Sequence, residues 1–270
     1  MTSNLGVGIG YRAPLHTFIL SHAEWIDWLE FNAEEFMPLS AARMKLLDDL
    51  GDKFRIVPHF TELSIAGPGG PNPQHLDQVV ALAKHCASPW VSDHFCYTRT
   101  EGAAFDTLLP PPWDAHRVKL ATSNIQTVQN VTGLPIAVEN IAWTLQVGSL
   151  KAEAAALCEV LEATNASLLL DLHNLYCNSR NFNGDAGDLL RCFPLPRLCE
   201  VHLAGGQELG GFQLDSHDAR VPDAVWDLLS QTCELASVTS VLLERDAAFE
   251  NAEDDLLSDI ERARAIIQAG

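Results

Sequence analysis

Residues 167–174 read SLLLDLHN, and this stretch is especially informative about the fold because it joins a buried strand to a group of polar side chains. The run Ser167–Leu170 is nearly continuous in apolar character, as a strand covered on both faces should be. Asp171, His173 and Asn174 follow it directly. Seven more short apolar runs in the chain have the same character. They are Leu5–Ile9, Ile26–Phe31, Phe54–Val57, Trp90–Ser92, Ile136–Val138, Leu198–Leu203 and Ser240–Leu243.

Amphipathic stretches typical of helices fill the gaps between these runs. Ser40 is placed to cap a helix with an apolar stripe, and we expect that helix to end at Gly51. Further helices are predicted around residues 76–83, 118–128 (closed by Gly133), 151–164, 225–229 (after Pro222) and 252–269. Eight alternations of strand and helix predict an α/β fold, a parallel (β/α)8 TIM barrel that forms a single domain over residues 1–270. A doubly wound open sheet is the alternative.

The composition excludes several classes of protein. The formal net charge of −19 argues against a nucleic-acid binder and against docking on anionic lipid. No apolar run approaches the ~20 residues that a membrane-spanning helix needs, and the first residues lack the pattern of a signal peptide. The seven cysteines are odd in number and include no CxxC pair, which predicts reduced thiols in a cytoplasmic protein.

Acidic and imidazole side chains follow the expected strands, and in a parallel barrel the strand ends meet at one mouth. Carboxylates gathered there would repel one another, and no matching set of Lys or Arg follows these strands. Imidazole and carboxylate ligands suit iron, manganese or zinc, and their number favours two or three metals sharing bridging carboxylates. The strand-end residues are Glu30, Glu34, Glu35, His59, Asp93, His94, Glu139, Asn140, Asp171, His173, Asn174, His202, Asp215, His217, Asp218, Glu244, Arg245 and Asp246.

Each of these residues alone has an ordinary structural explanation. A single His at a strand end is usually hydrogen-bonded, Asp171 could cap the next helix, and Glu244 could belong to a salt-bridged rim. The joint pattern is the stronger signal, because a structural explanation would have to account for each strand separately. The tryptophans Trp28, Trp90, Trp113, Trp143 and Trp226 are expected to serve packing alone.

The ordered motifs VPHF, WVSDHF, LPPPW, AVENI, LLLDLHNLYCN, EVHLAG, DSHDARVPDAVW and VLLERD resemble those of the multinuclear non-heme iron-dependent oxidative enzymes. The resemblance extends from GVGIGYR to LLERD. It implies a xylose-isomerase-like barrel that modifies cysteine residues of ribosomally made peptides, using two or three irons in mixed Fe(II)/Fe(III) states and dioxygen. The implied ligands are His59, His94, Glu139, Asp171, His202, Asp215, His217 and Glu244, together with Asn174 or His173, between which the resemblance does not choose.

The resemblance also implies separate roles for these ligands. Glu139 would bridge two irons, Asp171, His202 and Glu244 would complete one of them, and His59 with His94 the other. Asp215 and His217 would hold a third iron or move substrate protons. The residues expected to take part in catalysis are therefore Glu139, Asp171, Asp215 and His217.

Within this family the chain is most similar to the methanobactin-biosynthesis branch, in its length and its LDLHN segment. That similarity implies oxidation of precursor-peptide cysteines to an oxazolone and an adjacent thioamide. It also implies a heterodimer with a smaller companion protein. A second branch excises the β-carbon of a C-terminal cysteine and shares the metal motifs, so these motifs leave both reactions open.

Two other classes of function remain as competitors. A redox-neutral barrel enzyme, such as a sugar isomerase or a zinc phosphodiesterase, would use similar side chains. The isomerase usually needs a Lys near its metals, however, and no Lys follows Lys151. The phosphodiesterase needs a cationic groove, which the net charge of −19 opposes. A non-enzymatic partner module would show an exposed apolar patch without converging ligands.

Overall fold

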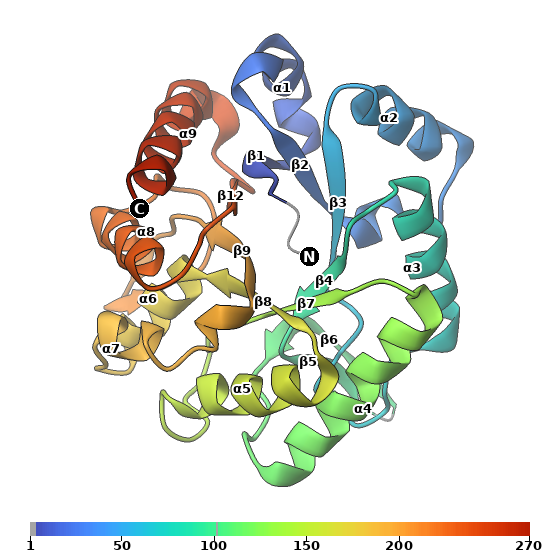
Figure 1. Cartoon of the computed structure of the whole chain (residues 1–270), viewed down its shortest axis with the longest axis vertical. Coiled ribbons are helices and arrows are strands. Elements are labelled where there is room, and N and C mark those ends of the chain that lie inside the picture. The colour runs from blue at the N-terminus through green and yellow to red at the C-terminus, as the bar shows by residue number, and fades with distance from the viewer. Residues whose placement is uncertain (1–3, 101) are drawn as a thin grey trace.

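A closed barrel of eight parallel strands forms the centre of the molecule (Figure 1). It is seen in a computed structural model that describes residues 4–100 and 102–270. Around the barrel the strands follow the order β1-β12-β9-β8-β7-β4-β3-β2. Their bounds are β1 Gly6–Tyr11, β2 Trp28–Asn32, β3 Arg55–Phe60, β4 Val91–His94, β7 Ile136–Glu139, β8 Ser167–Asp171, β9 Leu198–Leu203 and β12 Ser240–Leu243.

Helices surround this ring of strands on the outside (Figure 1). Their apolar faces pack on the outer surface of the barrel, where they form the largest buried cluster. The α-helices are α1 His16–Ser21, α2 Ala41–Gly51, α3 Pro73–His85, α4 Ala115–Thr132, α5 Ala152–Thr164, α6 Leu172–Asn181, α7 Ala186–Leu190, α8 Asp223–Leu235 and α9 Ala252–Ala269. Short 3-10 helices lie at Ala13–Leu15, Ala23–Trp25, Ala33–Phe36, Leu195–Arg197 and Phe249–Asn251.

The predicted (β/α)8 barrel is confirmed, since each of the eight apolar runs coincides with a barrel strand to within a few residues. The open-sheet alternative is wrong because the first strand pairs on both sides. Gly6 of β1 is in register with Ser240 of β12, and Ile9 of β1 is in register with Leu29 of β2. Pairing on both edges closes the sheet.

The helix ends follow the sequence signals with one exception. Ser40 caps α2 by accepting a hydrogen bond from the Arg43 N–H at 3.3 Å. Gly133 ends α4 in the left-handed conformation, with φ of 68°. Gly51 differs from expectation because it is the last residue of α2, and Asp52 follows it in a right-handed helical conformation. The α2 helix therefore ends where predicted, but without a left-handed glycine.

Two hairpins interrupt the loops at the mouth of the barrel. The first, β5 (Tyr97–Thr100) with β6 (Ala103–Leu109), follows β4. The second, β10 (Glu208–Leu209) with β11 (Phe212–Gln213), follows β9. No sequence signal had identified these strands, which are short or lie outside the eight-fold alternation.

The inside of the barrel is layered, with an apolar floor below a polar layer. Leu5, Trp28, Val57, Trp90, Ala137, Leu169, Cys199 and Leu242 form the floor, which we define as this cluster. Side chains two residues apart on a strand share a face. The polar residue two positions after a floor residue therefore lies above that floor residue. The pairs are Trp28 and Glu30, Val57 and His59, Trp90 and Ser92, Ala137 and Glu139, Leu169 and Asp171, and Leu242 and Glu244.

Two further sequence expectations bear on the whole chain. In the described ranges, no helix combines the length and apolar character needed to cross a bilayer. All seven cysteines are free thiols, and Cys96, Cys177 and Cys199 are buried.

Candidate metal centre

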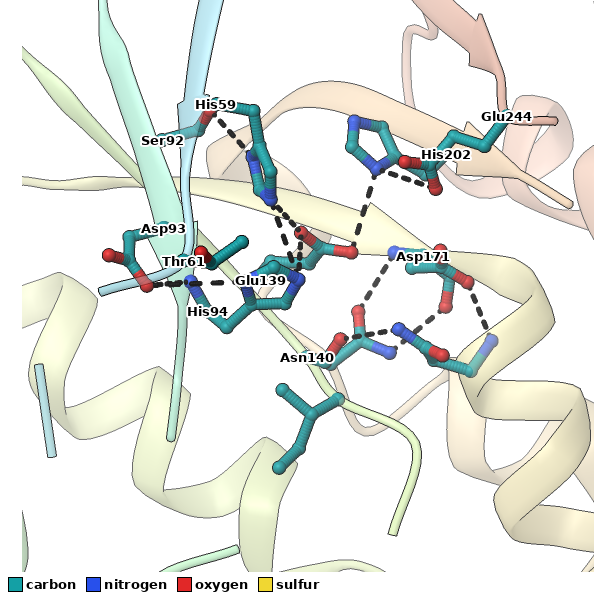
Figure 2. A network of polar contacts seen from close by, with 12 residues as sticks. His59, Thr61, Ser92, Asp93, His94, Glu139, Asn140, Asp171, His202 and Glu244 are labelled. Carbon is teal, nitrogen blue, oxygen red and sulfur yellow. Dashed lines mark hydrogen bonds and ion pairs between the residues drawn. The ribbon is translucent and has the colours of Figure 1, made fainter. Parts of the chain in front are cut away.

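The polar layer gathers its side chains above the floor, and Figure 2 shows several of them turned toward one another. Three groups of closely spaced ligand atoms carry the candidate centre. The first group is His59, His94 and Glu139, the second is Glu139, Asp171, His202 and Glu244, and the third is His173, Asp215 and His217.

The first group joins β3, β4 and β7 in a compact triangle. Glu139 Oε2 lies 3.3 Å from His59 Nε2 and 3.3 Å from His94 Nε2, and the two nitrogens are 3.4 Å apart. Ser92 Oγ lies 2.9 Å from His59 Nδ1, which holds the ring from behind. The Nε2 atoms of both imidazoles therefore face Glu139.

The second group shares Glu139 with the first. Glu139 Oε1 lies 3.5 Å from His202 Nδ1, and Glu244 Oε2 lies 3.3 Å from the same nitrogen. Asp171 brings a carboxylate oxygen within 4.8 Å of the ligand atoms of Glu139 and His202. The two oxygens of Glu139 thus face two different groups, which is the arrangement of a bridging carboxylate.

The third group lies between α6 and the loop after β11. Asp215 Oδ1 is 2.8 Å from His173 Nδ1 and 2.8 Å from His217 Nε2. His217 has a φ of 49°, an unusual conformation for a residue with a side chain, and Asp246 holds it. Asp246 Oδ2 lies 3.0 Å from His217 Nδ1, and the Asp246 N–H donates to the His217 carbonyl at 2.8 Å.

Asn140 fixes the strand end that carries Asp171. Its Nδ2 donates to the Asp171 carbonyl at 2.9 Å, and its Oδ1 accepts from the Asp171 N–H at 2.9 Å. Asp171 Oδ1 accepts from the Asn174 N–H at 2.6 Å, so Asp171 caps α6 while its other oxygen stays available. Asn174 Nδ2 donates to the Asn140 carbonyl at 3.1 Å, which leaves Asn174 Oδ1 free.

All ten residues expected as ligands therefore lie in or beside these three groups. The sequence profile described as "RiPP precursor modification enzyme MbnB/TglH/ChrH" matches residues 6–268, where RiPP denotes a ribosomally synthesised and post-translationally modified peptide. The chain belongs to this family. The resemblance noted from its motifs is thereby confirmed.

Relatives with a similar overall length accompany this match. A UPF0276 protein of Caulobacter vibrioides (strain NA1000 / CB15N) is 30% identical over 267 residues, covering 98% of this chain and 95% of the relative. A UPF0276 protein of Acinetobacter baylyi is 31% identical over 247 residues, covering 91% and 86%. These relatives extend the family across nearly the whole chain.

Solved structures with the same fold are far more distant in sequence. The IOLI protein with a bound zinc atom gives a TM-score of 0.66 at 12% identity and covers 98% of each chain. Endonuclease IV from Thermus thermophilus gives 0.57 at 14% identity, covering 98% of this chain and 100% of that one. At such identities the likeness supports the xylose-isomerase-like barrel fold alone.

Burial and neighbouring charged groups shift the pKa values of several residues in the centre of this MbnB/TglH/ChrH family member. Burial raises the pKa of Glu139 to about 7 against the opposing effect of His202. Burial lowers the pKa of His94 to about 4. The acids around His202, chiefly Glu244, raise its pKa well above the usual value even though burial opposes this. His217 has a raised pKa for the same reason, chiefly because of Asp215.

Five buried atoms of the predicted ligands have no hydrogen-bond partner in the described part of the chain. They are His94 Nδ1, Glu139 Oε2, Asp171 Oδ2, Asn174 Oδ1 and His202 Nδ1. An unpartnered buried polar atom costs about 1–3 kcal/mol, so this many among the gathered ligands favour a bound partner. Carboxylate, amide and imidazole donors without thiolate are those that iron, manganese and zinc accept, so the residues fit a metal cluster.

Three buried residues that lie beneath the centre, outside its three groups, were not among the predicted ligands. Glu30 and Glu200 lie beneath His202, and Trp90 donates to Glu200 through its indole N–H, beyond the packing role expected for it. Glu200 could have been found, because it precedes His202 by two residues on one strand and so shares its face. The bond from Trp90, which spans 110 positions, has no local sequence signal.

Proposed function

We propose that the chain is an iron- and dioxygen-dependent oxidase that modifies cysteine residues of a ribosomally made precursor peptide. The observation that carries the proposal is the pair of groups joined by Glu139, whose two oxygens face separate sets of ligands. A bridging carboxylate of this kind suits two metals that act together on one substrate. Membership of a peptide-modification family supplies the class of substrate.

The proposed positions of the metals follow the three groups. His59, His94 and Glu139 would hold one iron, while Glu139, Asp171, His202 and Glu244 would hold a second. Asp215 and His217 would hold a third, completed by His173 or Asn174. Bound iron would supply activation of dioxygen and binding of the cysteine thiolate. The geometry supports either residue as the last ligand. Asn174 has a free, buried Oδ1, and His173 Nδ1 lies 2.8 Å from Asp215 Oδ1.

The chain's own residues offer a path for protons between this centre and solvent. Asp215 Oδ1 lies between His173 Nδ1 and His217 Nε2 at 2.8 Å from each. His217 Nδ1 lies 3.0 Å from Asp246, whose side chain is 39% exposed. A proton leaving the substrate thiol could pass through Asp215 and His217 to Asp246. For His217 this role is the alternative to metal binding, because a metal on Nε2 would occupy the nitrogen that receives the proton from Asp215.

The electrons balance for the methanobactin-type reaction. Conversion of a cysteine unit to an oxazolone and a thioamide removes four electrons and four hydrogens, and one dioxygen accepts four electrons when it is reduced to water.

We further propose that a smaller companion protein forms a heterodimer with the chain and presents the peptide. Excision of the cysteine β-carbon is the alternative outcome at the same centre.

The test uses protein made together with a cysteine-bearing precursor peptide and the proposed companion protein. We expect more than one iron per chain, and dioxygen consumption only when the cysteine-bearing peptide is present. E139A should lose iron and activity together, because it removes the shared ligand. D259N is the matched control, since Asp259 is a buried acid on α9, outside all three groups.

Full activity of E139A with normal iron content would refute the proposal. Zinc or magnesium in place of iron, with no dioxygen consumed, would favour a redox-neutral barrel enzyme. The peptide mass separates the two oxidative reactions, because ring formation removes hydrogens only, whereas excision removes a fragment that contains carbon.

A further inference from the structure

The two ring nitrogens of His202 face different surroundings. Nδ1 faces the metal centre, 3.5 Å from Glu139 and 3.3 Å from Glu244. Nε2 faces the floor, 3.1 Å from Glu200 Oε1 and 3.3 Å from Glu30 Oε1. A neutral imidazole carries a proton on only one nitrogen, so the hydrogen bond at Nε2 decides what Nδ1 can do.

Glu200 is held in place from the other side by Trp90. The Trp90 indole N–H donates to Glu200 Oε2 at 3.0 Å, and Glu200 is fully buried. Trp90 belongs to the floor and packs just before β4, while Glu200 lies on β9. One carboxylate oxygen therefore accepts from Trp90 and the other faces His202. As a carboxylate, Glu200 accepts on both sides.

We infer that Trp90 and Glu200 form a positioning pair that holds the proton of His202 on Nε2 and presents the Nδ1 lone pair to the metal centre. The inference rests on the proposed metal site. It assigns functions to two residues that lie outside the three ligand groups. A hydrogen-bonded carboxylate behind a metal-binding imidazole fixes both the tautomer and the ring orientation.

Replacement of Glu200 by Gln tests this pair because it changes one acceptor into a donor while keeping the shape. If the new amide NH2 faces Trp90, two donors meet. If it faces His202, Nε2 must accept, and the proton moves to Nδ1, where it blocks the metal. Either arrangement disturbs the geometry that the carboxylate provides.

Glu30 offers a matched control at the same nitrogen. E30Q also removes a buried carboxylate within 3.3 Å of Nε2. Its amide can, however, turn its oxygen to His202 and its NH2 to the position of Glu30 Oε2, an atom without a hydrogen-bond partner. E30Q therefore changes the charge without forcing two donors together.

The experiment is titration of metal-free protein with Co(II), followed by calorimetry and by the visible absorption of the bound ion. We expect E200Q to bind one Co(II) about 10–100-fold more weakly than wild type, with an altered spectrum, and E30Q to stay within a few-fold of wild type. W90F/E200Q should recover Co(II) affinity relative to E200Q, because removal of the indole donor lets the introduced glutamine turn its oxygen to His202.

Wild-type affinity and spectrum in E200Q would overturn this inference alone. Equal losses of Co(II) affinity in E200Q and E30Q would also overturn it, since the loss of a negative charge, and not the direction of the hydrogen bond at His202 Nε2, would then explain the effect. A wild-type protein that binds no Co(II) would overturn the proposed metal site as well. If E200Q does not fold, W90F/E200Q is compared with W90F, and a tenfold or larger difference in Co(II) affinity between them would count against the pair.

Discussion

Glu139 is the residue on which the geometry of the centre depends most. It lies at the end of β7, is almost fully buried, and directs one oxygen to the two imidazoles and the other to His202. Burial raises its pKa to about 7, whereas burial lowers the pKa of His94 to about 4. Near neutral pH, a proton therefore competes with a metal at the carboxylate and not at the His94 imidazole.

This difference predicts how metal affinity depends on pH. Co(II) binds the deprotonated carboxylate, so its apparent affinity should fall about tenfold per pH unit as the pH drops below about 7, for each proton displaced. Proton release measured by calorimetry in buffers of different ionisation enthalpy checks this. E139Q, which has no carboxylate to titrate, should bind weakly with a flatter pH dependence. An affinity for wild type that does not change with pH would contradict the assignment.

At the scale of elements, the β10–β11 hairpin supports the loop that carries Asp215 and His217. Gly210 and Gly211 form its turn with φ of 61° and 85°. The hairpin is tied to α6 by the Asn181 amide, which accepts from the Gln213 N–H at 2.7 Å and donates to the Gln213 carbonyl at 2.9 Å. The conformation of the turn is therefore coupled to the third group of ligands.

Gly211→Ala should weaken this hairpin through its backbone conformation alone. A Cβ at Gly211 would meet nothing within 4 Å, so the cost comes from the positive φ and amounts to about 1–2 kcal/mol. We expect faster amide hydrogen exchange across residues 208–218 and weaker Co(II) binding at the third group only. Gly69→Ala is the control, because its Cβ also meets nothing within 4 Å and no positive φ applies. Equal effects of the two substitutions would refute this coupling.

Elements with a strong local signal were predicted well, and contacts between distant elements were not. Ser167–Leu170 and the other apolar runs are buried on both faces, so their composition alone identified the barrel strands. His59, Glu139 and Asp171 were found because each lies at the C-terminal end of its strand, just beyond the apolar run. The β10–β11 hairpin has two residues in each strand, too few for a period-2 pattern. The contact of Trp90 with Glu200 depends on the closure of the barrel, which local sequence does not encode.

On the scale of the whole molecule, the barrel places an acidic, metal-suited mouth above an apolar floor. The floor excludes water below Glu30 and Glu200, and the helices around it bury the outer surface of the strands. The chain carries a net charge of −19 and concentrates buried carboxylates in its centre. Metal-free protein must keep these acids together without cations, so metal binding should stabilise the whole fold.

Chelation should therefore lower the melting temperature, and more at pH 8 than at pH 6. Glu139 has a raised pKa of about 7, so at this residue the metal-free folded state binds more protons than the unfolded state between about pH 4.5 and about 7, whereas the lowered pKa of His94 acts in the opposite direction below about pH 6.5. Its free energy of unfolding falls as pH rises through that window. His202 and His217, whose pKa values are also raised, lose their stabilising charge as pH rises through those values. The metal-free protein is thus less stable at pH 8.

Bound metal replaces these protons and removes most of that dependence. At a metal concentration of about a hundred times the Kd, each site adds about 2.7 kcal/mol, which corresponds to about 5–10 °C in a chain of this size. Differential scanning fluorimetry of Co(II)-loaded and chelated protein at the two pH values measures the difference. E139A, without the shared ligand, should show a much smaller shift between the two forms. A shift in wild type that is absent, or that is larger at pH 6 than at pH 8, would show that these carboxylates are not held together by metal.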